Sequence, residues 1–536
     1  MQQKLSLRLL PSEAEDDAVI KNKIIKKTGN KVSDLTGYHI IKKSIDARGK
    51  NVFINLTVNA YLNEPYFRKT KKTFSFPDVS RADKTVIIIG AGPAGLFAAL
   101  KLLESGIKPV ILERGKDVKA RRRDLASLNK SGIINPESNY CFGEGGAGTY
   151  SDGKLYTRSN KRGDISRILS LFVHFGAEEN ILFDAHPHIG TNKLPQIITA
   201  MRQQIIECGG EVLFEKKVTD LNIIKGRLVS VVTSGQEIYN GDSFILATGH
   251  SARDIFQLLY KKNIGIEAKP FALGVRVEHP QSIIDSIQYH QPLPSTVVGI
   301  ERDHHLPPAS YSLIEQINDK SVFSFCMCPG GIIAPASSGA GELVVNGWSP
   351  SKRNNPFANS GMVVQVTHSD AIPATKHLNI KENDPLLFMH FQSMIEQASY
   401  NAGGGNFVAP AQRMVDFSNN KFSGSLPKNS YLPGLLSAEL KYVLPSFIYD
   451  TLSKGFISFG KKMKGFYTNE AIVVATESRT SSPIRIPRNI DSMMHPDLEN
   501  FYPCGEGAGY AGGIVSAAMD GENVASKIEQ KLMHKY

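Results

Sequence analysis

The segment IIIGAGPAG, residues 87–95, constrains the fold of this chain more than any other feature. An apolar run leads directly into Gly90, Gly92 and Gly95, and a helix-forming stretch follows. The first glycine permits a tight turn, the second lets the backbone approach a pyrophosphate, and the third lets the helix pack on the strand. Glu113 ends the next apolar stretch, where a carboxylate can accept hydrogen bonds from a ribose. This order predicts a Rossmann-like α/β domain that binds a dinucleotide.

A second GxGxxG spacing lies in FYPCGEGAGYAGG, residues 501–513, at Gly507, Gly509 and Gly512. A second dinucleotide half-site needs a further strand and an acidic residue beyond its helix, and the sequence ends at Tyr536. We therefore expect these residues to form the last strand and helix of the first unit. The predicted domain is thus built from two chain segments.

The 536 residues are too many for one hydrophobic core, so several domains are expected. We predict a small basic α+β module at residues 1–78 and the first segment of the dinucleotide-binding domain at 84–268. An inserted α+β substrate domain should cover residues 269–465. The second segment of the dinucleotide-binding domain should cover residues 466–536.

The N-terminal module carries most of the excess positive charge. Residues 1–84 hold seventeen Lys and Arg against nine Asp and Glu, whereas the whole chain has a formal charge of +11. Ser12 and Glu15 have capping-box spacing, which predicts a helix that ends at Gly29, before two strands. A basic module could meet nucleic acid or an acidic partner, but no nucleic-acid motif accompanies the charge. A solvated lysine face is the favoured interpretation.

Composition excludes several classes of protein. The longest nearly uncharged stretch is too short for a membrane span, and the N-terminus lacks a signal-peptide pattern, so we expect a cytoplasmic protein. Five cysteines without CxxC spacing argue against disulfides and a zinc site, and we expect no metal. Cys326 and Cys328 in FCMCPGG could form a redox pair, but CxC is a strained disulfide spacing, and packing is the favoured role.

Several motifs carry a family resemblance. GAGPAG with Glu113, FILATG at residues 244–249 and the terminal CGEGAGYAGG resemble the FAD-binding domain of the glutathione-reductase-like flavoprotein superfamily. GEGGAGTYSDGKL, GVRVEHP, FCMCPGG, ESRTSSPIRIPR and CGEGAGYAGGI are similar to the bacterial group of uncharacterised FAD-dependent dehydrogenases, which carries a small N-terminal module. The resemblance implies FAD as cofactor and spans nearly the whole chain. It does not identify a substrate, because the group has no settled one.

The resemblance also implies roles for individual residues. Glu113 would contact the adenosine ribose, and Glu506 the ribityl or pyrophosphate region. The first glycine motif would meet the pyrophosphate, and the glycines before the last helix would approach the flavin pyrimidine edge. The FAD contacts implied are Gly90, Gly92, Pro93, Ala94, Gly95, Glu113, Arg114, Gly145, Gly146, Thr149, Ser151, Val218, Ala247, Thr248, Gly249, Gly505, Glu506, Gly512, Gly513 and Ile514.

The glycine-rich stretch NYCFGEGGAGTYSDGKLY, residues 139–156, does not lie between a strand and a helix. It therefore does not predict a second phosphate-binding turn. In related flavoproteins the equivalent stretch crosses the isoalloxazine, where side chains would block the ring. The alternative is a loop ordered only by tertiary packing.

Candidates for substrate binding and proton transfer come from the arginines and histidines. Arg479, Arg485 and Arg488 could bind an anionic substrate or the FAD phosphates, or could lie on a solvated hairpin. His186, His188, His250 and His279 are candidate proton donors, although a structural role is more common for a single histidine. The catalytic acid or base stays unassigned.

These observations predict an FAD-dependent oxidoreductase, a dehydrogenase that transfers hydride through flavin N5. No second dinucleotide domain is evident, so NADH or NADPH would dock transiently, unless the small-molecule substrate itself exchanges electrons with the flavin. Two alternatives stay open: a flavin-dependent RNA-modifying enzyme and a binding or scaffold protein that FAD stabilises. The oligomeric state is also open.

Overall fold

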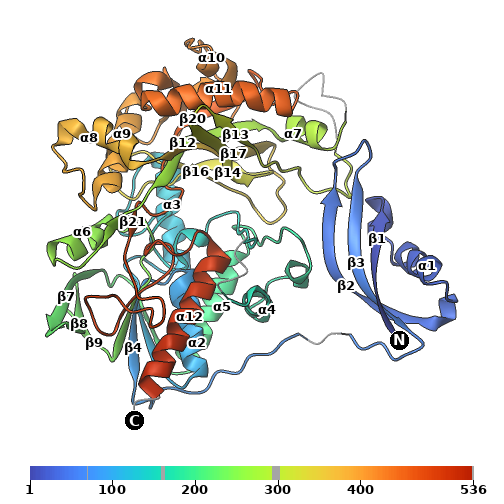
Figure 1. Cartoon of the computed structure of the whole chain (residues 1–536), viewed down its shortest axis with the longest axis horizontal. Helices are drawn as coiled ribbons and strands as arrows, with labels where there is room; N and C mark the ends of the chain where they lie inside the picture. The colour runs from blue at the N-terminus through green and yellow to red at the C-terminus, as the bar shows by residue number, and fades with distance from the viewer. Residues whose placement is uncertain (69–70, 158–162, 292–301, 534–536) are drawn as a thin grey trace.

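Three sheets organise the chain in the computed structural model, which describes residues 1–68, 71–157, 163–291 and 302–533. Figure 1 shows a parallel sheet with helices beside it, a larger and mostly antiparallel sheet above, and a small N-terminal sheet to one side. The chain is thus a mixed α/β protein. No described helix is long and apolar enough to cross a membrane.

The parallel sheet has the strand order β22-β10-β4-β5-β6. Its strands are β4 (Thr85–Ile89), β5 (Lys108–Leu112), β6 (Glu211–Leu213), β10 (Ser243–Leu246) and β22 (Phe501–Pro503). All neighbours pair in parallel. β22 comes from the C-terminal end of the chain and pairs with β10, so both ends of residues 85–533 contribute to one sheet.

Two helices that are far apart in sequence pack against each other beside this sheet. α2 (Pro93–Glu104) begins after Gly92 with proline at its first position, as is common at helix starts. α12 (Ile514–Met533) lies alongside it (Figure 1). A Cβ added at Gly521 of α12 would lie 2.1 Å from the carbonyl oxygen of Ala94. The two helix backbones can approach this closely only because residue 521 is glycine.

The seven-stranded sheet forms the middle of the chain, in the order β13-β14-β17-β12-β20-β18-β19. Its strands are β12 (Phe271–Pro280), β13 (Ile314–Ile317), β14 (Lys320–Cys328), β17 (Phe357–Val366), β18 (Ala409–Arg413), β19 (Leu435–Ser437) and β20 (Ile472–Glu477). The boundary predicted at residue 466 separates β20 from this sheet, whereas β20 pairs with both β12 and β18. A short apolar run does not specify which sheet it joins.

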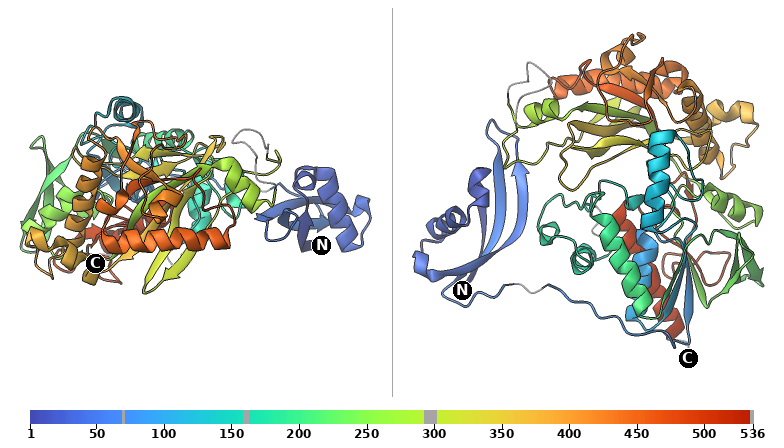
Figure 2. Two further views of the ribbon diagram at one scale, coloured as in Figure 1. Left: turned by 90° about the horizontal axis from the view of Figure 1, so that it is seen from above. Right: turned by 180° about the vertical axis from the view of Figure 1, so that it is seen from behind.

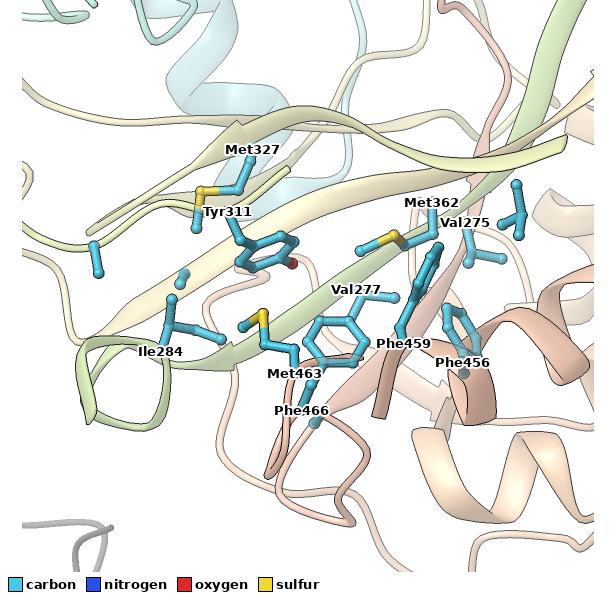
Figure 3. Close-up of a cluster of buried hydrophobic side chains, with 14 of the residues drawn as sticks. Val275, Val277, Ile284, Tyr311, Met327, Met362, Phe456, Phe459, Met463 and Phe466 are labelled. Atoms are coloured by element: carbon cyan, nitrogen blue, oxygen red, sulfur yellow. The ribbon is translucent and has the colours of Figure 1, made fainter. Parts of the chain in front are cut away.

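One face of this sheet packs against α11 (Ser446–Lys462). Figure 3 shows Val275 and Val277 of β12 and Met362 of β17 facing Phe456 and Phe459 of the helix. These side chains are almost completely buried. The other face of the sheet therefore faces the parallel sheet and its helices.

The N-terminal module consists of β1 (Gln2–Leu9), α1 (Asp17–Thr28), β2 (Leu35–Asp46) and β3 (Phe53–Leu62), with the sheet order β1-β3-β2. The helix ends at Gly29 as predicted, but the side chain of Asp16 caps it. Residues 12–15 form a 3₁₀ turn instead of the predicted capping box. Figure 2 shows the module beside the rest of the chain.

The remaining elements complete the layers. They are α3 (Val118–Ser131), α4 (Ile165–His174), α5 (Leu194–Glu207), β7 (Val218–Ile224), β8 (Arg227–Thr233), β9 (Ile238–Asn240), α6 (Arg253–Lys261), β11 (Glu267–Ala268), α7 (Gln281–Gln288), β15 (Ile332–Pro335), β16 (Val345–Trp348), α8 (His368–Thr375), α9 (Leu387–Ala402), α10 (Met414–Ser418) and β21 (Ile484–Arg485). β7 and β8 form a hairpin that turns at Lys225 and Gly226.

The contact between α2 and α12 leads to a prediction about stability. Gly521→Ala should lower the free energy of unfolding by about 1–3 kcal/mol, because the new methyl group meets backbone that cannot move aside. Thermal unfolding monitored by circular dichroism measures the change. The matched control is Gly424→Ala, at an exposed glycine with no atom near the added carbon. Equal melting temperatures for the two variants would contradict the prediction.

Candidate functional site

A cavity of about 410 Å³ lies against the C-terminal ends of the parallel strands. Residues from the first glycine turn, the stretch 141–156, β14 and the segment before α12 all line it. The carboxyl end of an open parallel sheet is where ligands bind in this type of fold. The predicted site residues that line the cavity are Gly90, Gly92, Pro93, Ala94, Glu113, Arg114, Gly146, Ser151, Val218, Ala247, Thr248, Gly249, His250, Arg479, Gly505, Glu506, Gly512, Gly513 and Ile514.

The first glycine turn has the geometry that a pyrophosphate requires. Gly90 has a φ of +108°, and a Cβ there would lie 2.5 Å from the carbonyl oxygen of Ala247. At Gly92 an added Cβ would meet no atom within 4 Å, so this backbone is open to the cavity. Gly95 lies behind the wall, where its Cβ would lie 2.0 Å from the carbonyl oxygen of Gly90. Gly95 therefore allows helix packing and does not face the cavity.

Glu113 joins three walls of the cavity. Its side chain is 5% exposed, and its two oxygens accept hydrogen bonds from the backbone N–H groups of Ala91, Gly115 and Gly143, each at 2.9 Å. A carboxylate that accepts several backbone N–H groups is firmly held. Glu113 lines the cavity where a ribose is predicted, and it also fixes the glycine turn to the glycine-rich stretch.

The glycine-rich stretch passes over the starts of α2 and α12. A Cβ at Gly146 would lie 3.2 Å from the Cα of Gly92, and one at Gly148 would lie 3.3 Å from Cγ1 of Ile514. Gly146 and Ser151 line the cavity, whereas Gly145 and Thr149 do not.

Thr149 and Arg121, which do not line the cavity, support the glycine-rich stretch from behind. Thr149 donates its hydroxyl to the carbonyl of Glu144 at 2.7 Å. The guanidinium of Arg121, which is completely buried, donates to the carbonyls of Asn139, Tyr140 and Glu144. Arg121 was not predicted, because an arginine in the pattern of α3 is more often a surface residue.

The segment before α12 supplies the opposite wall. Gly512 and Gly513 precede the first residue of the helix, and a Cβ at either position would meet no atom within 4 Å. Glu506 lines the cavity, and its carboxylate lies 3.5 Å from Nδ1 of His250. Two helix N-termini therefore face the cavity, and each offers N–H groups and a positive dipole end to an anion.

Three of the four candidate histidines, His186, His188 and His279, do not line the cavity. His279 is buried in the middle domain, where its Nε2 lies 2.8 Å from the carbonyl oxygen of Phe466, and burial lowers its pKa to about 4. Nε2 of His188 lies 3.1 Å from the carbonyl oxygen of Ser351. Burial lowers the pKa of His188 most, and the charge of Arg353 lowers it further. The structure therefore argues against His188 and His279 as proton donors. His250 alone among the predicted catalytic candidates lines the cavity.

The three candidate arginines do not form one anion site. Arg479 lines the cavity, but its guanidinium is paired with Glu396 at 3.0 Å. Arg488 binds Asp520 at 2.6 Å, and Arg485 is exposed outside the cavity. The sequence pattern places these charges close in the chain, but the fold points them in different directions.

Several cavity residues were not assigned to the site from the sequence. Lys154, Tyr156 and Asn346 line the end of the cavity nearest to β14, together with Cys326, which the sequence assigned to packing. Lys154 lies three residues after Ser151 in the glycine-rich stretch, so its position was a usable signal. Asn346 had none, because only the fold of the middle domain brings it to the cavity.

Potential metal ligands lie elsewhere. Within the described part of the chain, Asp303, His304 and His305 form the one close group of such side chains. Asp303 and His304 are exposed, and none of the three lines the cavity.

Comparison with protein families supports the FAD prediction. Residues 83–146 match a family described as an FAD binding domain, and residues 270–480 match one described as FAD-dependent protein, C-terminal domain-like. Residues 1–61 match a domain of unknown function. An uncharacterized protein of Clostridium beijerinckii is 38% identical, over 96% of this chain and 97% of that protein. FAD is confirmed as the cofactor, whereas the wider superfamily stays a prediction.

Solved structures show weaker similarity. Tetracycline destructase Tet(51) is 12% identical over 84% of this chain and 83% of that chain, with a TM-score of 0.33. Halogenase PltM is 11% identical over 84% of this chain and 69% of that chain, with a TM-score of 0.36. Similarity at this level carries no information about the substrate.

The residues of the cavity fit FAD. Gly92, Gly512 and Gly513 leave open backbone at the two helix N-termini, where side chains would occupy space that the cofactor needs. These positive helix ends suit a pyrophosphate. Glu113 lies at the end of β5, where a ribose is expected.

Glu113 gives a prediction about cofactor affinity. Glu113→Gln should weaken FAD binding by about ten- to a hundredfold, because the amide nitrogen cannot accept the N–H bonds that the carboxylate accepts, and a hydrogen bond to a charged group is worth about 1.5–3 kcal/mol. The dissociation constant of FAD is measured from the flavin fluorescence that appears as bound FAD is released on dilution. Glu207→Gln, at the exposed end of α5, is the control and should behave as wild type. Unchanged affinity in Glu113→Gln would show that this carboxylate does not shape the site.

Proposed function

The chain belongs to the family that includes the uncharacterized protein of Clostridium beijerinckii, and from this premise we propose that it is an FAD-dependent oxidoreductase. The proposed reaction is a dehydrogenation or reduction, in which hydride passes between a small molecule and flavin N5. When bound, FAD supplies an isoalloxazine ring that accepts or donates two electrons.

The observation that carries this proposal is the composition of the cavity. One set of lining residues comes from the glycine turn and α12, and another comes from the middle domain through Cys326 and Asn346. A site that only stored FAD would not need polar side chains from a second domain at one end. The middle domain therefore provides the substrate side of the proposed active site.

The chain's own residues would orient the ring and stabilise charge. The N-terminus of α12 directs its positive dipole end into the cavity through Gly512 and Gly513, and this end favours an anionic pyrimidine edge. Gly146, Ala147 and Gly148 line the cavity beside the start of α12 and are all small. It leaves room for a planar group.

Proton transfer would use side chains that face the cavity. His250 and Glu506 both line the cavity, and Nδ1 of His250 lies 3.5 Å from a carboxylate oxygen of Glu506, so an imidazole and a carboxylate are available there for proton transfer. Lys154 is a lysine at the cavity wall, and its ammonium lies 4.0 Å from Asp152. These groups, rather than an arginine cluster, would select a small polar substrate.

The electron donor is part of the proposal. NADH or NADPH would dock transiently, or the substrate would exchange electrons with the flavin directly. An RNA-modifying enzyme and an FAD-stabilised scaffold are the alternatives. Two lysines of the N-terminal module, Lys21 and Lys23, are paired with Asp17 and Glu13 on its own surface, so these two do not favour the RNA alternative.

An anaerobic experiment tests the function. The purified holoprotein is mixed with NADH, with NADPH, or with a panel of small organic hydride donors, and flavin absorbance is followed by stopped flow. We expect one class of donor to bleach the flavin at a rate that supports turnover. A flavin that no donor in any arm reduces would contradict the proposal and favour the scaffold.

The same preparation also tests whether the protein is an RNA-modifying enzyme instead. Binding to labelled RNA at low salt is compared between the full chain and a variant in which Lys26, Lys27 and Lys31 are changed to Gln. The RNA alternative requires salt-sensitive binding that this variant weakens. We expect no such binding.

A further inference from the structure

A cysteine of β14 faces the cavity at its middle-domain end. Cys326 lines the cavity, whereas Met327 points into the core beneath the sheet (Figure 3) and Cys328 is completely buried. The motif FCMCPGG thus places one thiol in the cavity and one behind its wall. Packing, the role that the sequence favoured, describes Cys328 but not Cys326.

A β-bulge gives Cys326 this orientation. In the pairing of β14 with β17, Phe325 lies opposite Gly361 and Cys328 opposite Asn359, so β14 holds one extra residue. Cys326 has a φ of +47°, in the left-handed region that residues with a Cβ rarely adopt. Bulges near active sites commonly re-aim a side chain, and such backbone persists only where its surroundings hold it in place.

Two cations hold the bulge. Arg276, which is completely buried, donates Nη1 and Nη2 to the carbonyl oxygen of Cys326 at 3.2 and 3.1 Å. Lys154 donates its ammonium to the carbonyl of Met327. The same ammonium lies 3.9 Å from Sγ of Cys326. The backbone and the thiol are therefore held by charges that also favour an anion at this position.

We propose that Cys326 is a thiolate nucleophile of this cavity, with Lys154 as its counter-ion, and that it adds to soft electrophiles of the α,β-unsaturated carbonyl class. In the addition, a bond forms between Sγ and the β-carbon, and the electron pair of the carbon–carbon double bond takes a proton from water at the α-carbon. No oxidant, reductant or leaving group is needed. The proposal deepens the proposed function, on which it rests for its place at the substrate side of the cavity.

The surrounding charges agree with this assignment. The neighbouring thiol of Cys328 lowers the pKa of Cys326 most, and the charges of Lys154 and Arg276 lower it further, against burial and the charge of Asp152. Burial lowers the pKa of Lys154, but the interactions of its ammonium with Cys326, Cys328 and Asp152 outweigh burial, so the pKa is raised overall.

The nearby carboxylates have cationic partners of their own. Asp152 is paired with Arg353 at 2.7 Å, and Glu477 lies 3.3 Å from Nε of Arg276. Their repulsion of a thiolate is thereby reduced. A lowered pKa increases the reactive thiolate fraction below the pH at which an ordinary cysteine ionises.

Alkylation of the holoprotein tests the proposal. Limiting N-ethylmaleimide and, separately, iodoacetamide are added over a range of pH, and the labelled peptide is identified by mass spectrometry. We expect Cys326 to react first, with a midpoint below that of an unperturbed cysteine. Lys154→Met should slow the reaction at neutral pH by about tenfold, the change that one pKa unit produces. Lys154→Arg should restore the rate, because it keeps the charge.

Controls separate this outcome from general damage. Lys320→Met removes a lysine of β14 itself, one that is paired with Asp370 outside the cavity, and should leave the rate unchanged. Cys141→Ser removes another thiol that lines the cavity and should leave labelling of Cys326 intact. The ultraviolet thiolate absorbance of wild type minus Cys326→Ser gives the pKa without any change at Lys154.

Two results would overturn the proposal: an ordinary pKa for Cys326, or first labelling at another cysteine. If Lys154→Met reacted at the wild-type rate, Lys154 would not be the counter-ion of Cys326. Flavin bleaching is measured separately on the wild-type holoprotein, so failure of this proposal is distinguishable from failure of the proposed function.

Discussion

A buried carboxylate, Glu396 of α9, connects the two larger parts of the protein. It is completely buried, and it accepts hydrogen bonds from Arg253 of α6 at 2.9 Å, from Arg479 at 3.0 Å and from Ser478 at 2.6 Å. Burial opposes its charge, but the two arginines outweigh burial and lower the pKa of Glu396 to about 2. Removing one partner of such a group leaves uncompensated buried charge, which commonly costs about 3–5 kcal/mol. The position of the middle domain over the parallel sheet thus depends on these pairs.

The cavity exists because of that position. Arg253 follows the strand β10, and Arg479 follows β20 of the middle sheet and lines the cavity. Fixing both to one carboxylate holds the wall of β14 opposite the glycine turn and the start of α12. The charge of Arg479 therefore serves the architecture of the site, which explains why a motif that looks suited to an anionic substrate does not offer a free guanidinium.

Local patterns in the sequence pointed to most residues that line the cavity at the glycine turn and at the start of α12, but to few of those at its middle-domain end. The turn at Gly90 and the helix after Gly92 follow from backbone requirements that only those residues meet, and the strand at residues 501–503 could be inferred by elimination. Cys326 could not be placed in the same way, because a bulge and contacts to Arg276 and Lys154 decide where its side chain points. Those contacts join residues that lie far apart in the chain.

The N-terminal module is connected to the same cavity wall through the backbone. Lys43 of β2 donates its N–H to the carbonyl of Phe183 and accepts from the N–H of Ala185. Residues 187–189, which follow shortly after Ala185, pair with the segment that carries Lys154. The N–H of Leu155 donates to the carbonyl of Pro187, and the N–H of Ile189 donates to the carbonyl of Gly153. Hydrogen-bonded backbone thus leads from the edge of the module's sheet to the ammonium beside Cys326. The module is thus joined by backbone hydrogen bonds to the segment that carries Lys154, without contributing a described side chain to the cavity lining.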